Sequence, residues 1–361
     1  MAVYVSTIVL VLIFSTIAEY SQNNKKDRNL KERKLFSYYF GMLTAVCLIL
    51  VAGLRWRVGT DYWNYARLYS DFAQNWWNSL VTFNEPGIRI IAALSSSIHH
   101  DSSTMFFIAS LITVSLSVWT MFKYSNTFSL SILLYIFVGA WHGSFNGVRQ
   151  YLACAILFAG HRYIIKREFR KYFLIVFLAS TFHISALSMI VLYFVPRRQL
   201  KHKDIILLGI FIILGLSLYD PALELVSNVL MNSNRNPLST ENSYVTQQVS
   251  ILRIGVMVAP TILYLIINPK DKLRLEDNFY INMLFINASV YIITMNSAYF
   301  ARFAIYTNIY IALGFPKIFK GVDKKLSLFI IYIALILYAA FWSYEIMITD
   351  NLRNYQWIFW R

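Results

Sequence analysis

Long apolar stretches alternate with short polar segments along almost the whole chain. A helix needs about 20 apolar residues to cross roughly 30 Å of hydrocarbon, and many of the stretches approach this length. Strands of a membrane barrel would be shorter and would alternate in polarity. The pattern therefore predicts an all-α polytopic membrane protein with a single transmembrane domain over residues 1–361. The stretches cover about 3–19, 35–54, 104–122, 127–141, 146–165, 172–195, 204–219, 251–268, 279–297, 300–316 and 326–345.

The basic segments between these stretches set the expected orientation. The segment "SQNNKKDRNLKERK" (21–34) is the most basic, and such loops stay in the cytoplasm. The N-terminus and "RWRVGTDYWNY" (55–65) are then expected on the outer side. Further along the chain, Lys123 and "KREFRK" (166–171) fall inside, while "WHGSFNG" (141–147) falls outside.

The apolar stretch 172–195 breaks this order if it crosses the membrane once. The basic segments 196–203, 268–274 and 317–325 would then all lie outside. A re-entrant helical hairpin near 172–195, with its tip near "STFHIS" (180–185), removes all three conflicts. Each half would have about a dozen residues, too few to span alone. The sequence thus predicts about ten transmembrane helices plus this hairpin, with both termini on the outer side.

Composition agrees with a membrane protein. The motifs that are missing from the sequence indicate a lipid-borne or already activated substrate. Hydrophobic residues make up 58% of the chain and charged residues 14%, which fits an integral membrane protein. The net charge of +15 does not indicate nucleic acid, because the basic residues lie in loops between spans. No phosphate-binding glycine loop or nucleotide motif is present, so no cofactor is expected. Two outer loops, about 55–103 and 220–250, are long enough to cover a site.

With this topology every lysine is cytoplasmic and the outer face carries arginine only. Arginine binds phosphate and carboxylate through a planar, bidentate fork, which lysine cannot do. Weak selection against lysine plus chance would give the same face, so both explanations stay open. The outer arginines are Arg55, Arg57, Arg67, Arg89, Arg149, Arg235, Arg253, Arg302, Arg353 and Arg361.

Three of these arginines are expected in the first turn of a helix that enters from outside: Arg149 in "FNGVRQYL", Arg302 in "AYFARFAIY", and Arg253. The positive end of the helix dipole disfavours a cation there unless an anion is shared. For Arg149 and Arg302 an anion site is therefore favoured over a snorkelling side chain. For Arg253 the two explanations are balanced.

The segment 55–61, which follows the second apolar stretch, contains both basic and acidic residues. Arg55 and Arg57 follow a helix C-terminus, where a cation is expected anyway. Asp61 follows them by six and four residues, so acid and base share one local surface. Arg55 and Arg57 are predicted to bind substrate.

Tyrosines of the same segment have two explanations. Tyr62 and Tyr65 are candidate substrate-binding residues, because their rings could stack on sugars. An aromatic belt at the level of the lipid headgroups is the commoner arrangement, and it would include Trp63 and Tyr69.

His183, at the predicted hairpin tip, is the strongest histidine candidate. A histidine there could accept a proton near neutral pH. A neutral ring that satisfies backbone groups at the break is the alternative. Asp61 is the other candidate for the base, and the choice between the two stays open. These residues show no metal-ligand spacing such as HExxH, so no metal is predicted.

Four segments in order resemble the EpsG family, which belongs with the Wzy-type polymerases of bacterial exopolysaccharide, capsule and O-antigen: "RWRVGTDYWNY", "GVRQYLACAILFAGHRYIIKREFRKY", "STFHISALSMIVLYF" and "YFARFAIYTNIY". Each segment is short, and their order and spacing from about residue 50 to 320 carry the resemblance. The matching polar residues are Arg55, Gly59, Asp61, Tyr62, Tyr65, Arg149, His183 and Arg302.

The resemblance implies a bacterial inner-membrane enzyme whose active site faces the periplasm or exterior. It would link oligosaccharide repeat units carried on undecaprenyl diphosphate, by glycosyl transfer without a metal. Arg149 and Arg302 would stabilise the leaving diphosphate, Arg55 and Arg57 would hold a lipid phosphate, and His183 or Asp61 would take the proton. The expected partners are the lipid-linked oligosaccharide, membrane lipids and, as a further candidate, a chain-length regulator.

Two other classes remain as alternatives. A flippase for lipid-linked oligosaccharide would also use an arginine-lined cavity. Transporters of this kind usually contain internal repeats, and none is found here. A membrane O-acetyltransferase, or a glycosyltransferase that uses a polyprenyl-phosphate sugar, is a nearer alternative.

Overall fold

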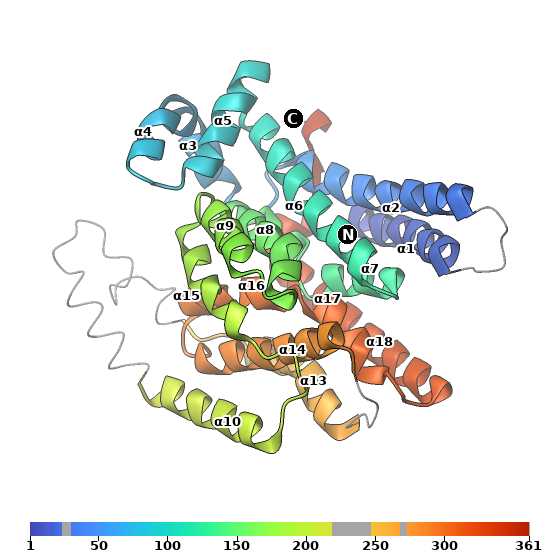
Figure 1. The fold of residues 1–361 in the computed structure, drawn as a ribbon. Coiled ribbons are helices and arrows are strands. Elements are labelled where there is room, and N and C mark those ends of the chain that lie inside the picture. Colours follow the sequence, from blue (N-terminus) through green and yellow to red (C-terminus); the bar gives the residue numbers. More distant parts are fainter. Residues whose placement is uncertain (24–29, 219–246, 268–272, 361) are drawn as a thin grey trace. The chain divides into compact units, whose positions relative to one another are not determined.

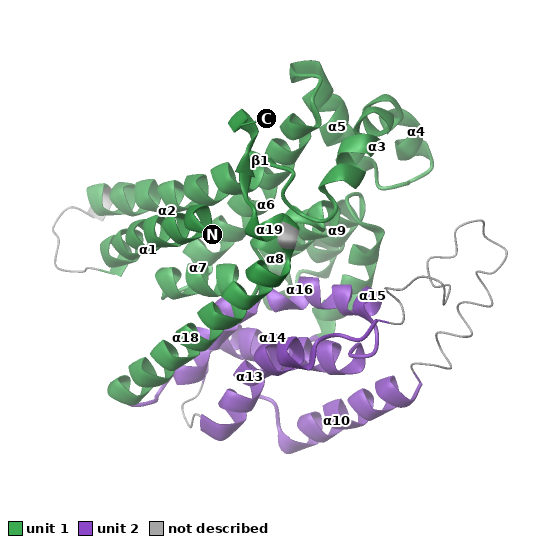
Figure 2. Ribbon diagram, turned by 180° about the vertical axis from the view of Figure 1, so that it is seen from behind, with its two compact units in different colours: residues 1–194, 324–361 green, residues 195–323 purple. Residues whose placement is uncertain are grey.

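The computed structural model describes residues 1–23, 30–218, 247–267 and 273–360. These residues form helices almost throughout, in two compact units (Figure 2). Unit 1 contains residues 1–194 and 324–361, and unit 2 contains residues 195–323. Most of the predicted outer loop 220–250 lies outside the described residues.

Unit 1 contains both ends of the chain (Figures 1 and 2). Its elements are α1 (Ala2–Asn23), α2 (Leu30–Gly53), β1 (Arg55–Trp56), α3 (Tyr62–Gln74), α4 (Trp76–Val81), α5 (Pro86–Ile98), α6 (Ser102–Tyr124), α7 (Phe128–Phe137), η1 (His142–Phe145), α8 (Val148–Ile165), α9 (Phe169–Ser180), η2 (Ile184–Phe194), α18 (Lys324–Ile348), α19 (Asp350–Arg353), β2 (Gln356–Trp357) and η5 (Ile358–Trp360).

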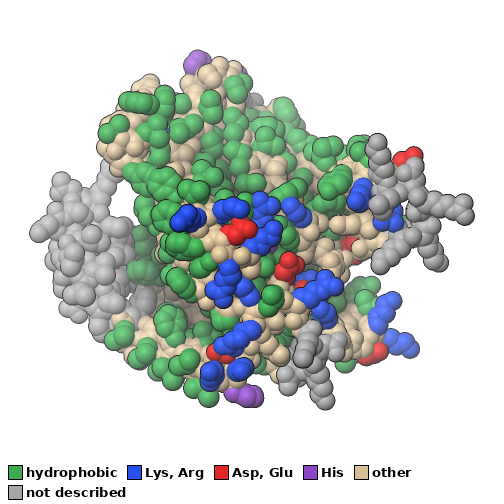
Figure 3. Space-filling view, in the orientation of Figure 1, with side chains coloured by type: hydrophobic (Ala, Val, Ile, Leu, Met, Phe, Trp, Pro, Cys, Tyr) green, Lys and Arg blue, Asp and Glu red, His purple; other side chains and the backbone are tan. Residues whose placement is uncertain are grey.

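Among the described residues, four helices of unit 1 are long and apolar enough to cross a membrane: α1, α2, α6 and α18. Helix α18 exposes large apolar side chains, among them Phe329, Ile336 and Leu337. Hydrophobic side chains also cover much of the face drawn in Figure 3, where Lys and Arg gather on part of it. Exposed apolar surface of this extent is typical of a protein surrounded by lipid. The all-α membrane class is confirmed, while the number of spans and their topology stay predictions.

Some predicted spans are shorter than their apolar stretches. Within 127–141, α7 has only 10 residues, because Gly139 adopts φ +84 and ends the helix. A short 3-10 turn, η1, follows before α8 begins.

The predicted break in 172–195 is present. Helix α9 ends at Ser180 and η2 begins at Ile184. The Tyr172 hydroxyl donates to the Met189 carbonyl at 2.7 Å, and the Phe169 and Tyr193 rings lie 5.0 Å apart. These two contacts show that the halves run antiparallel, as a hairpin. The second half is a 3-10 helix of 11 residues, a length that this conformation seldom reaches. The depth of the hairpin in a membrane stays a prediction.

The two termini meet at one end of unit 1. Strands β1 and β2 pair antiparallel, with Arg55 opposite Trp357. The N-terminal amine of Met1 donates to the Arg353 carbonyl, and the Tyr4 hydroxyl donates to Leu352 at 2.9 Å. The N-terminus, the segment 352–357 and β1 therefore lie at the same end of unit 1. Which side of a membrane this end faces stays a prediction.

The predicted outer loop 55–103 folds into three short helices, α3, α4 and α5. Tyr62, Tyr65 and Tyr69 recur at helical spacing and are all buried on one face of α3. Tyr62 stacks on Phe106 of α6, with ring centroids 4.6 Å apart. The aromatic-belt interpretation therefore fails for these tyrosines, because they pack against α5 and α6. Trp63 points outward and fits it.

Unit 2 is helical as well. Its elements are α10 (His202–Ser217), α13 (Ile251–Ile267), α14 (Leu275–Ile293), α15 (Ala298–Ala301), η3 (Arg302–Ala304), α16 (Ile305–Asn308), α17 (Ile311–Gly314) and η4 (Phe315–Phe319). The predicted span 300–316 is thus a series of short α and 3-10 turns. The buried Asn287 of α14 accepts from the Thr307 hydroxyl at 2.8 Å, which ties this series to α14.

Candidate active site

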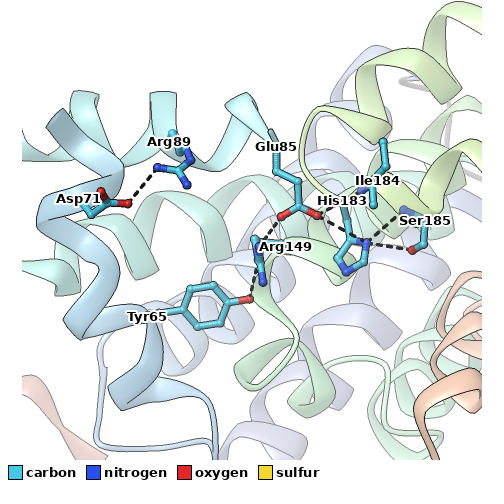
Figure 4. A network of polar contacts seen from close by, with 8 residues as sticks. All are labelled: Tyr65, Asp71, Glu85, Arg89, Arg149, His183, Ile184 and Ser185. Carbon is cyan, nitrogen blue, oxygen red and sulfur yellow. Dashed lines mark hydrogen bonds and ion pairs between the residues drawn. The ribbon is translucent and has the colours of Figure 1, made fainter. Parts of the chain in front are cut away.

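A polar cluster in unit 1 joins four segments that are far apart in sequence (Figure 4). Tyr65 comes from α3 and Glu85 from the residue before α5. Arg149 comes from the first turn of α8, and His183 from the hairpin tip. The structure therefore brings Arg149 and His183, two of the predicted site residues, around a carboxylate that the sequence did not single out.

Arg149 is the centre of the cluster. Its Nη1 forms an ion pair with Glu85 Oε2, and its Nε donates to the Tyr65 hydroxyl at 3.2 Å. The side chain of Arg149 is 35% exposed and that of Glu85 is 14% exposed. Because little water reaches the pair, its charges interact more strongly than at an open surface. The Arg149 side chain is nevertheless partly exposed to solvent.

Glu85 also contacts the hairpin tip. Its Oε1 accepts from the backbone N–H of Ile184 at 3.2 Å and lies 3.9 Å from Nδ1 of His183. One carboxylate thus connects α8 to the start of η2. Arg149 and the backbone N–H at the start of η2 both bind this carboxylate.

Local sequence explains why Glu85 reaches the cluster. Glu85 adopts the left-handed conformation, with φ 47 and ψ 56, and Pro86 begins the helix that follows. Left-handed backbone is uncommon for a residue other than glycine and is often found at functional sites. The N–H of Gly87 donates to the Thr181 carbonyl at 2.8 Å, which fixes the start of α5 to the hairpin tip.

His183 is held by its neighbour Ser185. The Ser185 backbone N–H points to Nδ1 at 3.3 Å, and the Ser185 hydroxyl lies 2.9 Å from the same nitrogen. Because the backbone N–H can only donate, the two contacts favour the tautomer in which Nδ1 is the acceptor. The side chain is 27% exposed, which leaves the imidazole accessible from solvent.

The loop before α8 is fixed by the segment that follows α2. The backbone N–H of Thr60 donates to the Asn146 side chain at 2.7 Å. Gly59 adopts φ +105, and a Cβ there would lie 2.7 Å from the Phe145 carbonyl. Only glycine fits this close approach, so "RWRVGT" and "GSFNGVR" position Arg149 together.

All four segments that build this cluster lie within the part of the chain that matches one protein-family model. The model of the EpsG family matches residues 38–358. The chain belongs to the EpsG family. Membership points to a polysaccharide polymerase-type function, to a glycosyltransferase-like enzyme and to a multi-pass membrane protein. No curated protein and no solved structure matches this EpsG-family chain.

The structure does not fit the substrate-binding role predicted for Arg55 in this member of the EpsG family. It is 1% exposed, and its guanidinium donates to the carbonyls of Ala52, Val58 and Phe145. Burial lowers its pKa to about 10, so it stays charged at neutral pH. A guanidinium enclosed in this way cannot reach a lipid phosphate. Its substrate-binding role is therefore replaced by a structural one, in which it joins the end of α2 to the loop before α8.

Three other predicted site residues of this segment differ from one another in their exposure to solvent. Arg57 is exposed and lies over the rings of Trp56 and Trp63, at 5.6 and 5.2 Å. Asp61 is half-buried immediately before α3, one turn ahead of Tyr65. Tyr62 is fully buried, so its ring cannot stack on a sugar in this conformation.

Arg253 and Arg302 belong to unit 2, and both are exposed. Arg253 lies in the first turn of α13, as expected. Arg302 follows the four-residue α15 and therefore lies in the second turn of its helical segment, not the first. Their convergence with Arg149 stays a prediction.

Glu85 is the residue that sequence reasoning missed. In "NEPG" an acidic residue before proline has the ordinary features of a helix start, so nothing marked it as functional. A second ion pair, Arg89 with Asp71 at 3.0 Å, lies in the same layer of α3 and α5 (Figure 4). Among the described residues, no group of three or more His, Cys, Asp or Glu could hold a metal ion.

Proposed function

We propose that this protein polymerises oligosaccharide repeat units carried on undecaprenyl diphosphate, at the outer face of the bacterial cytoplasmic membrane. The proposal is supported by family membership and carried by one observation. Arg149, which the Tyr65 hydroxyl and Glu85 hold in place, lies beside the accessible His183 at the hairpin tip. A fixed cation next to a proton-transfer group suits a reaction that releases a diphosphate.

In the proposed reaction, the growing chain on its lipid diphosphate is the donor. A hydroxyl at the non-reducing end of a new repeat unit attacks the anomeric carbon of the donor. The new C–O bond forms as the bond to the diphosphate oxygen breaks, and that oxygen keeps the electron pair. Arg149 binds the diphosphate and stabilises its growing charge, because a preorganised cation in a partly dry site needs little reorganisation.

The proton of the attacking hydroxyl goes to His183 or to Asp61. His183 is favoured, because it lies in the Arg149 cluster and a neutral imidazole has one ring nitrogen that can accept a proton. Among the other arginines, exposed Arg57 suits the phosphate of a bound lipid, and Arg253 is a further candidate.

A gel of surface polysaccharide from a deletion strain tests this function. Loss of a polymerase leaves single repeat units attached to their acceptor. Loss of a flippase leaves none, and loss of an O-acetyltransferase leaves a full ladder. Complementation with Arg149→Lys sharpens the result, because lysine keeps the charge without the bidentate fork. A full-length ladder from this variant would contradict the role proposed for Arg149.

A further inference from the structure

The guanidinium that is proposed to bind diphosphate already holds an anion from its own chain. Arg149 forms an ion pair with Oε2 of Glu85, while Oε1 accepts from the N–H of Ile184 at 3.2 Å. A carboxylate with both oxygens bound in this way resembles a phosphate oxygen pair in shape and charge. Glu85 thus occupies the place that an anionic ligand of Arg149 would take.

Charge makes simultaneous occupancy unfavourable. The diester diphosphate of the donor carries two negative charges, and Arg149 supplies one positive charge. With Glu85 in place, the guanidinium is already neutralised, and a second anion would meet a like charge in a site with little water. The incoming diphosphate must therefore compete with the carboxylate.

We propose that Glu85 is an internal placeholder for the diphosphate. It holds Arg149 in position while the site is empty, and the donor displaces it on binding. This inference rests on the proposed role of Arg149 in diphosphate binding. It adds a regulatory element to the same site, because affinity for the donor is set by exchange between two anions.

The segment that carries Glu85 can make this exchange without disturbing α5. Phe83 and Glu85 both have positive φ, 51 and 47, so release from Arg149 lets residues 82–85 relax toward more favourable backbone. The hydrogen bond from Gly87 to Thr181 keeps the start of α5 on the hairpin tip meanwhile.

Equilibrium binding of undecaprenyl diphosphate to the purified full-length protein tests the exchange. Glu85→Gln removes the charge and keeps one acceptor oxygen, for either Arg149 or the Ile184 N–H, because the NH2 group that replaces the other oxygen cannot accept. We expect this variant to bind at least about fivefold more tightly than wild type, the low end of typical coupling between sites. Asp71→Asn is the matched control, since Asp71 pairs with Arg89 outside the cluster and is 52% exposed. It should bind as wild type does.

Equal or weaker binding by Glu85→Gln would overturn the placeholder. Arg149→Ala separates this failure from failure of the proposed function. If Arg149→Ala loses binding while Glu85→Gln does not gain it, only the placeholder is wrong. If Arg149→Ala binds as tightly as wild type, the diphosphate role of Arg149 fails as well.

A measurement on the wild-type protein covers the case in which Glu85→Gln does not fold. Hydrogen–deuterium exchange of the peptide over residues 82–88 should become faster when undecaprenyl diphosphate is added, because Glu85 leaves Arg149. Unchanged or slower exchange at saturating ligand would contradict the displacement.

Discussion

The backbone N–H of Gly87 donates to the carbonyl of Thr181 at 2.8 Å. This bond joins the start of α5 to the tip of the hairpin formed by α9 and η2. Glu85 lies two residues before Gly87, and His183 lies two residues after Thr181. The contact therefore sets the distance between the carboxylate and the imidazole, and the rest of the cluster depends on it.

Gly87→Ala should disturb this junction. A Cβ at residue 87 would lie 2.8 Å from the Phe182 ring, so the ring or α5 must shift. We expect a loss of about 1–3 kcal/mol of stability and shorter polymer, measured by thermal unfolding in detergent and by a polysaccharide gel. Gly209→Ala is the control, because nothing lies within 4 Å of a Cβ there. Equal stability of the two variants would show that the junction is not tight.

Tyr65→Phe tests whether the hydroxyl that accepts from Arg149 matters for catalysis. The change keeps the buried ring and removes about 1 kcal/mol of hydrogen bonding, so stability should fall by no more than about 1 kcal/mol, while the polymerisation rate should fall about fivefold. Tyr69→Phe, one turn along α3, removes a hydroxyl bonded to Ser95 and His99 and should leave the rate unchanged. A similar rate for both variants would argue against positioning of Arg149 by Tyr65.

Arg55→Ala should act on folding and not on substrate binding. It removes a fully buried side chain and leaves the Ala52, Val58 and Phe145 carbonyls without this donor. We expect a loss of at least about 3 kcal/mol, seen as a lower unfolding temperature and less protein in the membrane. Arg57→Ala, at an exposed position, should change stability by less than about 0.5 kcal/mol. A stable, inactive Arg55→Ala protein would restore the substrate-binding role.

Cysteine labelling tests the re-entrant hairpin. In a chain whose free Cys47 and Cys154 are replaced by Ser or Ala, single cysteines are placed at Lys171 and Lys203. Both should react with an impermeant maleimide only after the cells are opened, and a cysteine at Ser102 should react from outside. If the cysteine at residue 203 reacts in intact cells, the chain crosses the membrane once between the two lysines.

The sequence was sufficient for features that depend on local patterns. The polar interruption in "STFHIS" predicted the break at the hairpin tip, and the helix N-terminus marked Arg149. The sequence analysis did not identify Glu85 as a site residue, because its role comes from a contact with α8 that no local pattern reveals. Arg55 was misjudged for the same reason: its burial depends on carbonyls from Val58 and Phe145. The aromatic belt was the wrong interpretation for Tyr62, Tyr65 and Tyr69, because their three- and four-residue spacing places them on one buried face of α3.

The most direct test of the central claim is polymerisation in vitro by the purified protein. The substrate is a repeat unit linked to undecaprenyl diphosphate, and the variants are wild type, Arg149→Ala and the control Arg67→Ala. Arg67 donates to the Trp63 carbonyl and to the Asn64 side chain, both on its own helix. Wild type and Arg67→Ala should produce a ladder of polymers and release undecaprenyl diphosphate, while Arg149→Ala should leave single repeat units. A ladder of normal length and rate from Arg149→Ala would contradict the account.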